Sequence, residues 1–229
     1  MAKIAIIDDI INHSYLKYPE RVKNSMVIDW RGVRQADAEA RPQRFTHASA
    51  CALILEKMTD DYELFSIAVS KEMEETDCLQ KALGLCGELG ADIVEVSFGT
   101  SLFTEPALLG EIVRELGESG CVVTAAMPGT YDFTGCKNMI GVCCDRYGVM
   151  KPGEYVFERM GPSAAKVTVN CNFRIRETEC GQSDSFSTAA ITARINRYIN
   201  EGIKAMGDIL YCLEKDESPK YKAVLKLIR

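Results

Sequence analysis

The alternation between short β-branched runs and longer amphipathic runs is the feature that most constrains how this chain can fold. The short runs are nearly continuous in apolar character, as strands buried on both faces are. They occupy residues 3–8, 64–70, 92–99, 121–126 and 139–145. The longer runs carry apolar residues at helical spacing and occupy residues 46–58, 76–90 and 105–120. This order predicts an α/β fold with three layers, in which helices cover both faces of a mostly parallel central sheet.

The rest of the chain adds a shorter strand, a ribbon and a long helix to this prediction. SMVIDW, residues 25–30, is expected to form a short strand. Residues 166–175 alternate between apolar and polar side chains, which predicts an antiparallel edge strand or ribbon. A long amphipathic helix is expected from Phe186 to about Leu213. No linker or repeat interrupts residues 1–229, so we expect one domain, with a tail from about residue 215 that is basic at its end.

Charge and hydropathy exclude several classes of partner. The net charge of −6 argues against nucleic acid and against anionic membranes. Two aspartates interrupt the first apolar run before it reaches the length of a signal segment, and no apolar run approaches the roughly 18 residues of a membrane span. We therefore expect a cytoplasmic protein without a nucleic-acid or membrane partner.

The ten cysteines form no CxxC pair and no Cys/His zinc pattern. Without a secretory signal, they are interpreted as reduced, buried, small hydrophobic residues. The ones that fall in apolar-periodic segments or in an expected strand are Cys51, Cys78, Cys86, Cys121, Cys143 and Cys144. A thiol enzyme would need a positioned partner for its cysteine, and the sequence shows none. The sequence therefore predicts no metal site and no cofactor.

Three groups that suit acyl transfer fall at one end of the predicted sheet, where active sites of parallel sheets lie. Asp8 ends the first strand, His47 opens a helix, and Ser185 opens the last helix. A histidine can take the proton of a serine hydroxyl, and a carboxylate can hold the imidazole in the required tautomer. The same residues could instead only cap helices or end a strand, and these features alone leave both readings open.

Several motifs resemble those of the subtilisin-like serine proteases, the S8 subtilases. IAIIDDII (4–11) is similar to the Asp motif of that family, HASACALIL (47–55) to its His motif and SDSFSTAAITARI (183–195) to its Ser motif. VEVSFGT (94–100) is similar to the substrate-binding strand, CVVTAA (121–126) to the strand before the oxyanion asparagine, and MIGVCCD (139–145) to the strand after it. These blocks follow the order of the family and cover roughly residues 3–205.

The resemblance implies a serine endopeptidase with the triad Asp8, His47 and Ser185, acting on a peptide or protein substrate. It implies that the substrate adds as a strand beside Ser97, Phe98 and Gly99. It is strongest to small intracellular subtilase-like proteins of bacterial peptide-maturation systems, which implies processing of a peptide precursor. Calcium is common in the family, but the sequence offers no convincing ligand cluster for it.

The motifs also depart from the family pattern. DDI stands in place of D-S-G, and HASA in place of H-G-T-H. In the Ser motif, Asp184 replaces threonine before Ser185, and Ala189-Ala190 replaces a Pro-His pair. Pro128 or Gly129 stands where the family has its oxyanion asparagine, and Asn138 is too far along the chain to replace it. Losing one oxyanion donor costs roughly 10²–10³ in rate, so a slow, specific protease is expected.

Two alternatives to a protease remain open from the sequence. One is a catalytically impaired pseudoprotease that keeps the subtilase fold and binds a peptide or partner protein. The other is an unrelated α/β enzyme, such as a nucleotide or cofactor binder, which no GxGxxG or P-loop motif supports.

Overall fold

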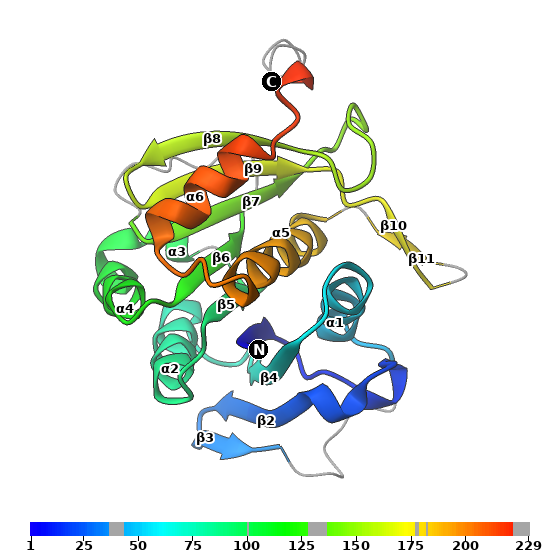
Figure 1. Cartoon of the computed structure of the whole chain (residues 1–229). Helices are drawn as coiled ribbons and strands as arrows, with labels where there is room; N and C mark the ends of the chain where they lie inside the picture. Colours follow the sequence, from blue (N-terminus) through cyan, green and yellow to red (C-terminus); the bar gives the residue numbers. More distant parts are fainter. Residues whose placement is uncertain (37–43, 100, 128–136, 177–178, 182, 222–229) are drawn as a thin grey trace.

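The computed structural model describes residues 1–36, 44–99, 101–127, 137–176, 179–181 and 183–221. One nine-stranded sheet crosses the molecule, with helices on both of its faces (Figure 1). Its strand order is β3-β2-β4-β1-β5-β6-β7-β9-β8, and a separate two-stranded ribbon pairs β10 with β11. The predicted α/β fold with three layers is confirmed.

The strands and helices have the following bounds. The sheet contains β1 (Ala2–Asp8), β2 (Val22–Asp29), β3 (Gly32–Gln35), β4 (Tyr62–Val69), β5 (Ile93–Val96), β6 (Val122–Ala126), β7 (Met139–Cys144), β8 (Tyr155–Gly161) and β9 (Ala164–Val169). The ribbon contains β10 (Phe173–Arg176) and β11 (Glu179–Gly181). The α-helices are α1 (His47–Met58), α2 (Glu75–Glu88), α3 (Ser101–Thr104), α4 (Pro106–Glu118), α5 (Asp184–Asn200) and α6 (Met206–Lys215). Within the described ranges, short 3₁₀ turns span His13–Tyr15, Pro19–Arg21 and Pro219–Tyr221.

The centre of the sheet is parallel, and its two edges are antiparallel. β1 pairs in parallel with β4 on one side and with β5 on the other, so that Ile7 lies opposite both Ile67 and Val96. β3 and β8 close the two edges as antiparallel strands. Because the central strands run in the same direction, the carboxyl ends of β1, β4 and β5 meet at one edge of the sheet.

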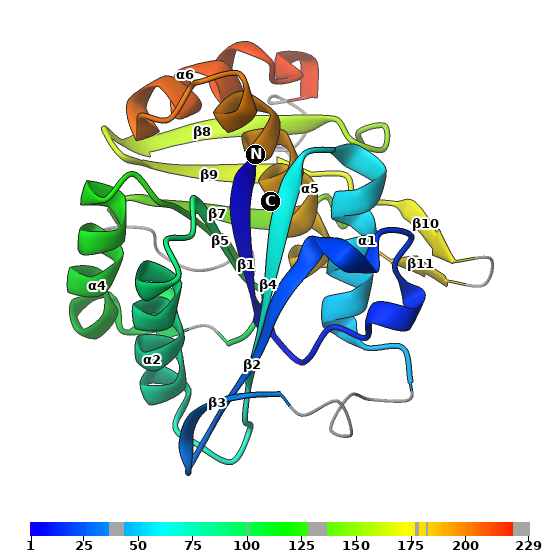
Figure 2. The same ribbon diagram turned by 60° about the horizontal axis from the view of Figure 1, so that its bottom comes forward.

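The two faces of the sheet carry separate apolar clusters. Ile4 and Ile6 of β1 pack on the side of α1 and α5, whereas Ala5 and Ile7 pack on the side of α2 and α4. Figure 2 shows the two helix pairs on opposite sides of the central strands. A strand covered on both faces needs apolar side chains at every position, which explains the continuous apolar runs in the sequence. No helix among the described residues is both long and apolar enough to span a membrane.

The expected long helix from Phe186 to Leu213 is wrong, because the structure has two helices there. α5 ends at Asn200, and α6 begins at Met206. Gly202 between them has φ +92°, a left-handed conformation that ends a helix and that side chains with a Cβ rarely adopt. The N–H of Ile203 donates to the carbonyl of Tyr198 at 2.9 Å and closes the end of α5.

The region 166–175 also differs from its prediction. β9 ends at Val169 and pairs with both β7 and β8, so it is not an edge strand. The antiparallel part of the prediction is correct for its pairing with β8. The residues after it form the ribbon strand β10 as a separate element that lies near α1 (Figure 1). SMVIDW lies largely within β2, as expected.

The predicted burial is confirmed for Cys51, Cys78, Cys86, Cys121 and Cys143, and Cys171 is buried as well. It is wrong for Cys144, at the end of β7. Cys144 and Cys212 are free and partly exposed.

Replacing Gly202 with alanine should destabilise the protein by about 1 kcal/mol, because a Cβ is strained at this positive φ. Gly207→Ala is the matched control: Gly207 lies within α6, and no atom would crowd a Cβ there. We expect the control to be neutral or to stabilise by about 0.5–1 kcal/mol. Urea unfolding of both variants measures the difference. Equal effects would contradict the explanation of the helix break.

Candidate active site

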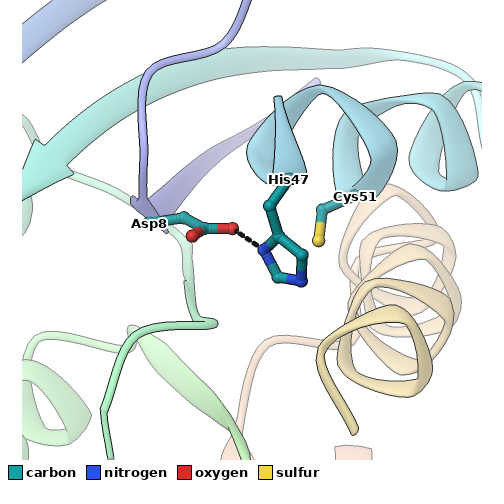
Figure 3. A group of neighbouring side chains, drawn as sticks. All are labelled: Asp8, His47 and Cys51. Atoms are coloured by element: carbon teal, nitrogen blue, oxygen red, sulfur yellow. Dashed lines mark hydrogen bonds and ion pairs between the residues drawn. The ribbon is translucent and has the colours of Figure 1, made fainter. Parts of the chain in front are cut away.

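Asp8 and His47 form a hydrogen-bonded pair where β1 ends and α1 begins (Figure 3). The Asp8 Oδ2–His47 Nδ1 distance is 2.5 Å. The Asp8 side chain is 10% exposed and the His47 side chain 38%, so the carboxylate lies inside and the ring reaches the surface. This is the geometry in which a carboxylate fixes the imidazole tautomer and leaves Nε2 available for reaction.

The environment shifts the pKa of both members of this pair. Burial raises the pKa of the Asp8 carboxyl above its ordinary value, although the hydrogen bond with His47 opposes this shift. The hydrogen bond with Asp8 raises the pKa of His47, against the opposing effect of burial. His47 therefore holds a proton more tightly than a free imidazole does.

Asp9, the second carboxylate of the DDI motif, binds the backbone of α1. Its Oδ1 accepts from the N–H of Ala48 at 2.8 Å, and its Oδ2 accepts from the N–H of His47 at 3.2 Å. Thr46 caps the same helix by accepting from the N–H of Ser49 at 3.1 Å. These donors would otherwise lack intrahelical partners. The departure from D-S-G thus has a structural role, since it ties α1 to the end of β1.

Ser185 is the second residue of α5 and is half-buried. The N-cap residue Ser183 accepts from the N–H of Phe186 at 3.0 Å. The Phe186 ring stacks on the His47 ring, with 5.4 Å between ring centroids and 24° between planes. The first turn of α5 therefore lies against the Asp8–His47 pair. Among the described residues, the hydrogen bonds of His47 run to Asp8 and Asp9, and none joins it to Ser185.

Asp184, the extra carboxylate beside Ser185, is held by the end of β7. Its Oδ1 accepts from the N–H of Cys144 at 2.8 Å, and its Oδ2 pairs with Arg146 Nη2 at 3.1 Å. An open cleft of about 320 Å³ is lined by these three residues and Ser183. Both carboxylate oxygens of Asp184 are thus engaged by Cys144 and Arg146, and the guanidinium of Arg146 offsets the charge.

The expected substrate strand, Ser97 to Gly99, directly follows β5. Phe98 is partly buried against the cluster on the α2 and α4 side. Gly99 has φ +71°, and a Cβ there would collide with the Glu75 carboxylate. That carboxylate accepts from the N–H of Ser101 at 2.6 Å and from its hydroxyl at 2.7 Å. Glu75 therefore holds the turn that follows the strand.

The expected oxyanion positions, Pro128 and Gly129, lie outside the described residues. Asn138 does not serve in their place. It directly precedes β7, and its side chain packs against Gly117 near the end of α4, where a Cβ would come within 2.5 Å of the amide carbon. That is the amino-terminal end of a parallel strand, opposite to the edge where β1 ends.

Glu95 is a polar residue of the site that the sequence analysis missed. It lies in β5 and is 0% exposed. Its Oε1 accepts from the Ser97 hydroxyl at 3.0 Å, and its Oε2 has no hydrogen-bond partner among the described atoms. Burial raises the pKa of Glu95 to about 8. The signal was present in the sequence, since one glutamate interrupts the apolar run DIVEV.

Cys51 lies between Glu95 and the Asp8–His47 pair. Its Sγ is 3.9 Å from the Ser97 hydroxyl, and its thiol interacts with the Glu95 carboxyl. Ligand atoms of Asp8, His47 and Cys51 all lie within 4.8 Å of one another (Figure 3). His47 and Cys51 are four residues apart on one helix, a spacing that the sequence analysis did not consider.

Glu95→Gln should change how stability depends on pH. Below about pH 4.5 the glutamate is protonated in both the folded and the unfolded chain. Between about pH 4.5 and pH 8 only the unfolded chain loses the proton, so the free energy of unfolding falls as pH rises, by roughly 5 kcal/mol in total. The glutamine variant lacks this loss and should gain stability over wild type across this window. Urea unfolding at pH 5, 6.5 and 8 measures it.

Glu88→Gln, which replaces an exposed carboxylate of α2, is the matched control. Its free energy of unfolding should vary with pH as that of wild type does. A Glu95→Gln curve parallel to wild type would show that Glu95 is ionised in the folded protein at neutral pH.

Comparisons with known proteins agree on the fold. No family model matches the chain, and no curated protein matches its sequence. A lanthipeptide protease structure matches with a TM-score of 0.62 and 11% identity, over 95% of this chain and 81% of that one. The prenylagaramide maturation protease PagA matches with a TM-score of 0.57 and 14% identity, over 96% of this chain and 85% of that one. A mutant of the protease domain of PatA matches with a TM-score of 0.55 and 11% identity, over 95% of this chain and 97% of that one. The chain therefore shares its fold with subtilisin-like proteases of peptide maturation.

Proposed function

We propose that this protein is a slow, specific serine endopeptidase that processes a peptide precursor. The observation that carries the proposal is the Asp8–His47 hydrogen bond beside the first turn of α5, where Ser185 lies. The fold adds support, because its structural neighbours include a lanthipeptide protease and the maturation protease PagA.

In the proposed reaction, His47 Nε2 takes the proton of the Ser185 hydroxyl as its oxygen attacks the peptide carbonyl. Asp8 accepts the Nδ1–H of His47 and stabilises the imidazolium that forms. His47 then gives the proton to the leaving amine, and water hydrolyses the acyl-enzyme by the same route in reverse. The hydrogen bond between Ser185 and His47 forms with the substrate bound, as in many enzymes of this type.

The start of α5 offers partial stabilisation of the oxyanion. The first N–H groups of a helix have no intrahelical acceptor, and the helix dipole is positive there. Ser183 uses the N–H of Phe186, which leaves the N–H of Ser185 as the donor closest to the reacting oxygen. A site with one such donor in place of two is expected to turn over slowly.

The peptide is proposed to add as a strand beside Ser97, Phe98 and Gly99. The Ser97 side chain points inward to Glu95, so this segment would offer its backbone to the peptide. The turn at Gly99, held by Glu75, keeps the end of that backbone in place.

A peptide-binding pseudoprotease is the second candidate. Pro128 and Gly129 stand where the family places its oxyanion asparagine, and this motivates it. Hydrolysis distinguishes the two candidates, because the pseudoprotease binds peptide without cleaving it.

A fluorophosphonate should label wild-type protein once, on Ser185, because only an activated serine reacts rapidly with it. Ser185→Ala and His47→Ala should both abolish the adduct. Ser183→Ala is the matched control, since it removes a neighbouring hydroxyl and costs about 1 kcal/mol of helix capping but should keep the label. Intact-mass spectrometry gives the count. Folded wild-type protein without an adduct would favour the pseudoprotease.

The rate of this labelling should rise with pH as His47 loses its proton, with a midpoint above 6.5 because Asp8 raises the pKa of His47. Asp8→Asn should move the midpoint to lower pH and reduce the limiting rate by a factor on the order of 10⁴, since the tautomer is no longer fixed. Stopped-time labelling from pH 5 to pH 9 measures both. An unchanged midpoint in Asp8→Asn would contradict the assignment of His47 as the base.

A further inference from the structure

We propose that Asp8, His47 and Cys51 form a binding site for a divalent cation of the zinc type, which holds the protein inactive by occupying the base. Binding of the cation stands on the geometry of these three residues alone, whereas its inhibitory effect rests on the proposed protease function.

The geometry of the three side chains fits one ion. His47 and Cys51 are four residues apart on α1, the spacing at which two side chains lie on one helix face and can share a metal. Asp8 reaches the same point from the end of β1 (Figure 3). Their ligand atoms lie within 4.8 Å of one another, and tetrahedral zinc separates its ligand atoms by roughly 3.5 Å. Small side-chain rotations therefore suffice to close the site.

The donor set selects the kind of ion. An imidazole nitrogen, a thiolate and a carboxylate oxygen are the ligands that zinc uses in proteins, whereas calcium and magnesium require oxygen ligands. Three protein ligands leave a fourth position for water. His47 is the partly exposed member, so an ion from solvent would meet the imidazole first.

The polar groups around the cluster favour a cation. Glu95 is fully buried against the Cys51 thiol, and its Oε2 lacks a hydrogen-bond partner among the described atoms. Asp8 is buried as well, and neither carboxyl pairs with a lysine or arginine in the described part of the chain. Two buried carboxyls and a thiol thus lie around one imidazole. A divalent cation would stabilise the deprotonated forms of these groups, which burial alone disfavours.

Binding would exchange protons for the ion. The Cys51 thiol releases its proton to solvent, the hydrogen bond between Asp8 and His47 opens to admit the metal at Nδ1, and the proton of the neutral imidazole moves from Nδ1 to Nε2. An imidazole that binds the metal through Nδ1 carries its proton on Nε2, so it cannot accept the Ser185 proton in the proposed reaction.

Cobalt(II) is the probe that tests the site directly, because tetrahedral cobalt with a thiolate ligand gives a sulfur-to-cobalt charge-transfer absorption. Wild-type protein should bind one equivalent of Co²⁺ and show this band. Cys51→Ser and His47→Gln should each lose the band. Cys212→Ser and His13→Gln, which alter a partly exposed thiol and the other histidine, are the matched controls and should keep it. A folded wild type without the band, or a band that survives in both Cys51→Ser and His47→Gln, would overturn the proposal.

Zinc chloride then tests the regulatory consequence. Zn²⁺ should slow fluorophosphonate labelling of wild type at least about 10-fold, and a chelator should restore it. Glu95→Gln should weaken Co²⁺ binding by about 10-fold, the usual effect of removing a group that supports a metal ligand. Unchanged affinity in Glu95→Gln together with unchanged labelling under Zn²⁺ would sink the regulatory role.

The two experiments separate the metal site from the protease function. Ser185→Ala keeps all three proposed ligands, so it should bind Co²⁺ as wild type does. A cobalt band in a protein that no fluorophosphonate labels would support the metal site and reject the protease. Fluorophosphonate labelling of a protein that shows no cobalt band would support the protease and reject the metal site.

Discussion

Two adjacent carboxylates at the end of β1 hold the site together. Asp9 accepts two N–H groups at the start of α1, and Asp8 accepts the ring N–H of the first residue of that helix. The pairing of β1 with β4 and β5 fixes where these carboxylates lie. The position of His47 is thus set by the sheet through two separate contacts, one on its backbone and one on its ring. The serine that follows the aspartate in the D-S-G motif would offer these two N–H groups a single hydroxyl oxygen in place of the two carboxylate oxygens of Asp9.

The order of the elements and the Asp8–His47 contact could be predicted from the sequence, because both follow from a parallel sheet. Continuous apolar runs identify strands covered on both faces, and residues that follow such strands meet at one edge. The resemblance to subtilases added Ser185, whose helix does pack beside His47. The break at Gly202 was missed because apolar periodicity continues on both sides of it. Only the backbone conformation of one glycine shows that two helices meet there.

The polar residues beneath His47 escaped prediction for a different reason. Glu95 was treated as part of a core strand, and Cys51 as a small hydrophobic residue. Both side chains are buried as expected, but the sequence analysis did not foresee that their polar groups meet around Ser97. A strand exposes alternate residues to opposite faces, so Glu95 and Ser97 both point toward α1, where Cys51 lies. That meeting depends on how β5 and α1 pack, which the sequence of either element does not contain.

The helix that carries Ser185 also shows how one departure from the subtilase motif can be accommodated. Ala189 and Ala190, where the family has a Pro-His pair, are buried against the sheet and its neighbouring helix. Small side chains let α5 approach closely, and Thr192 in the same helix meets Thr124 of β6 in a buried hydrogen bond of 2.7 Å. A buried hydroxyl pair tolerates little displacement, because separating it would leave two unsatisfied polar groups. The register of α5 on the sheet is therefore fixed about two turns beyond Ser185, so the loss of the motif's proline and histidine need not move the proposed nucleophile away from His47.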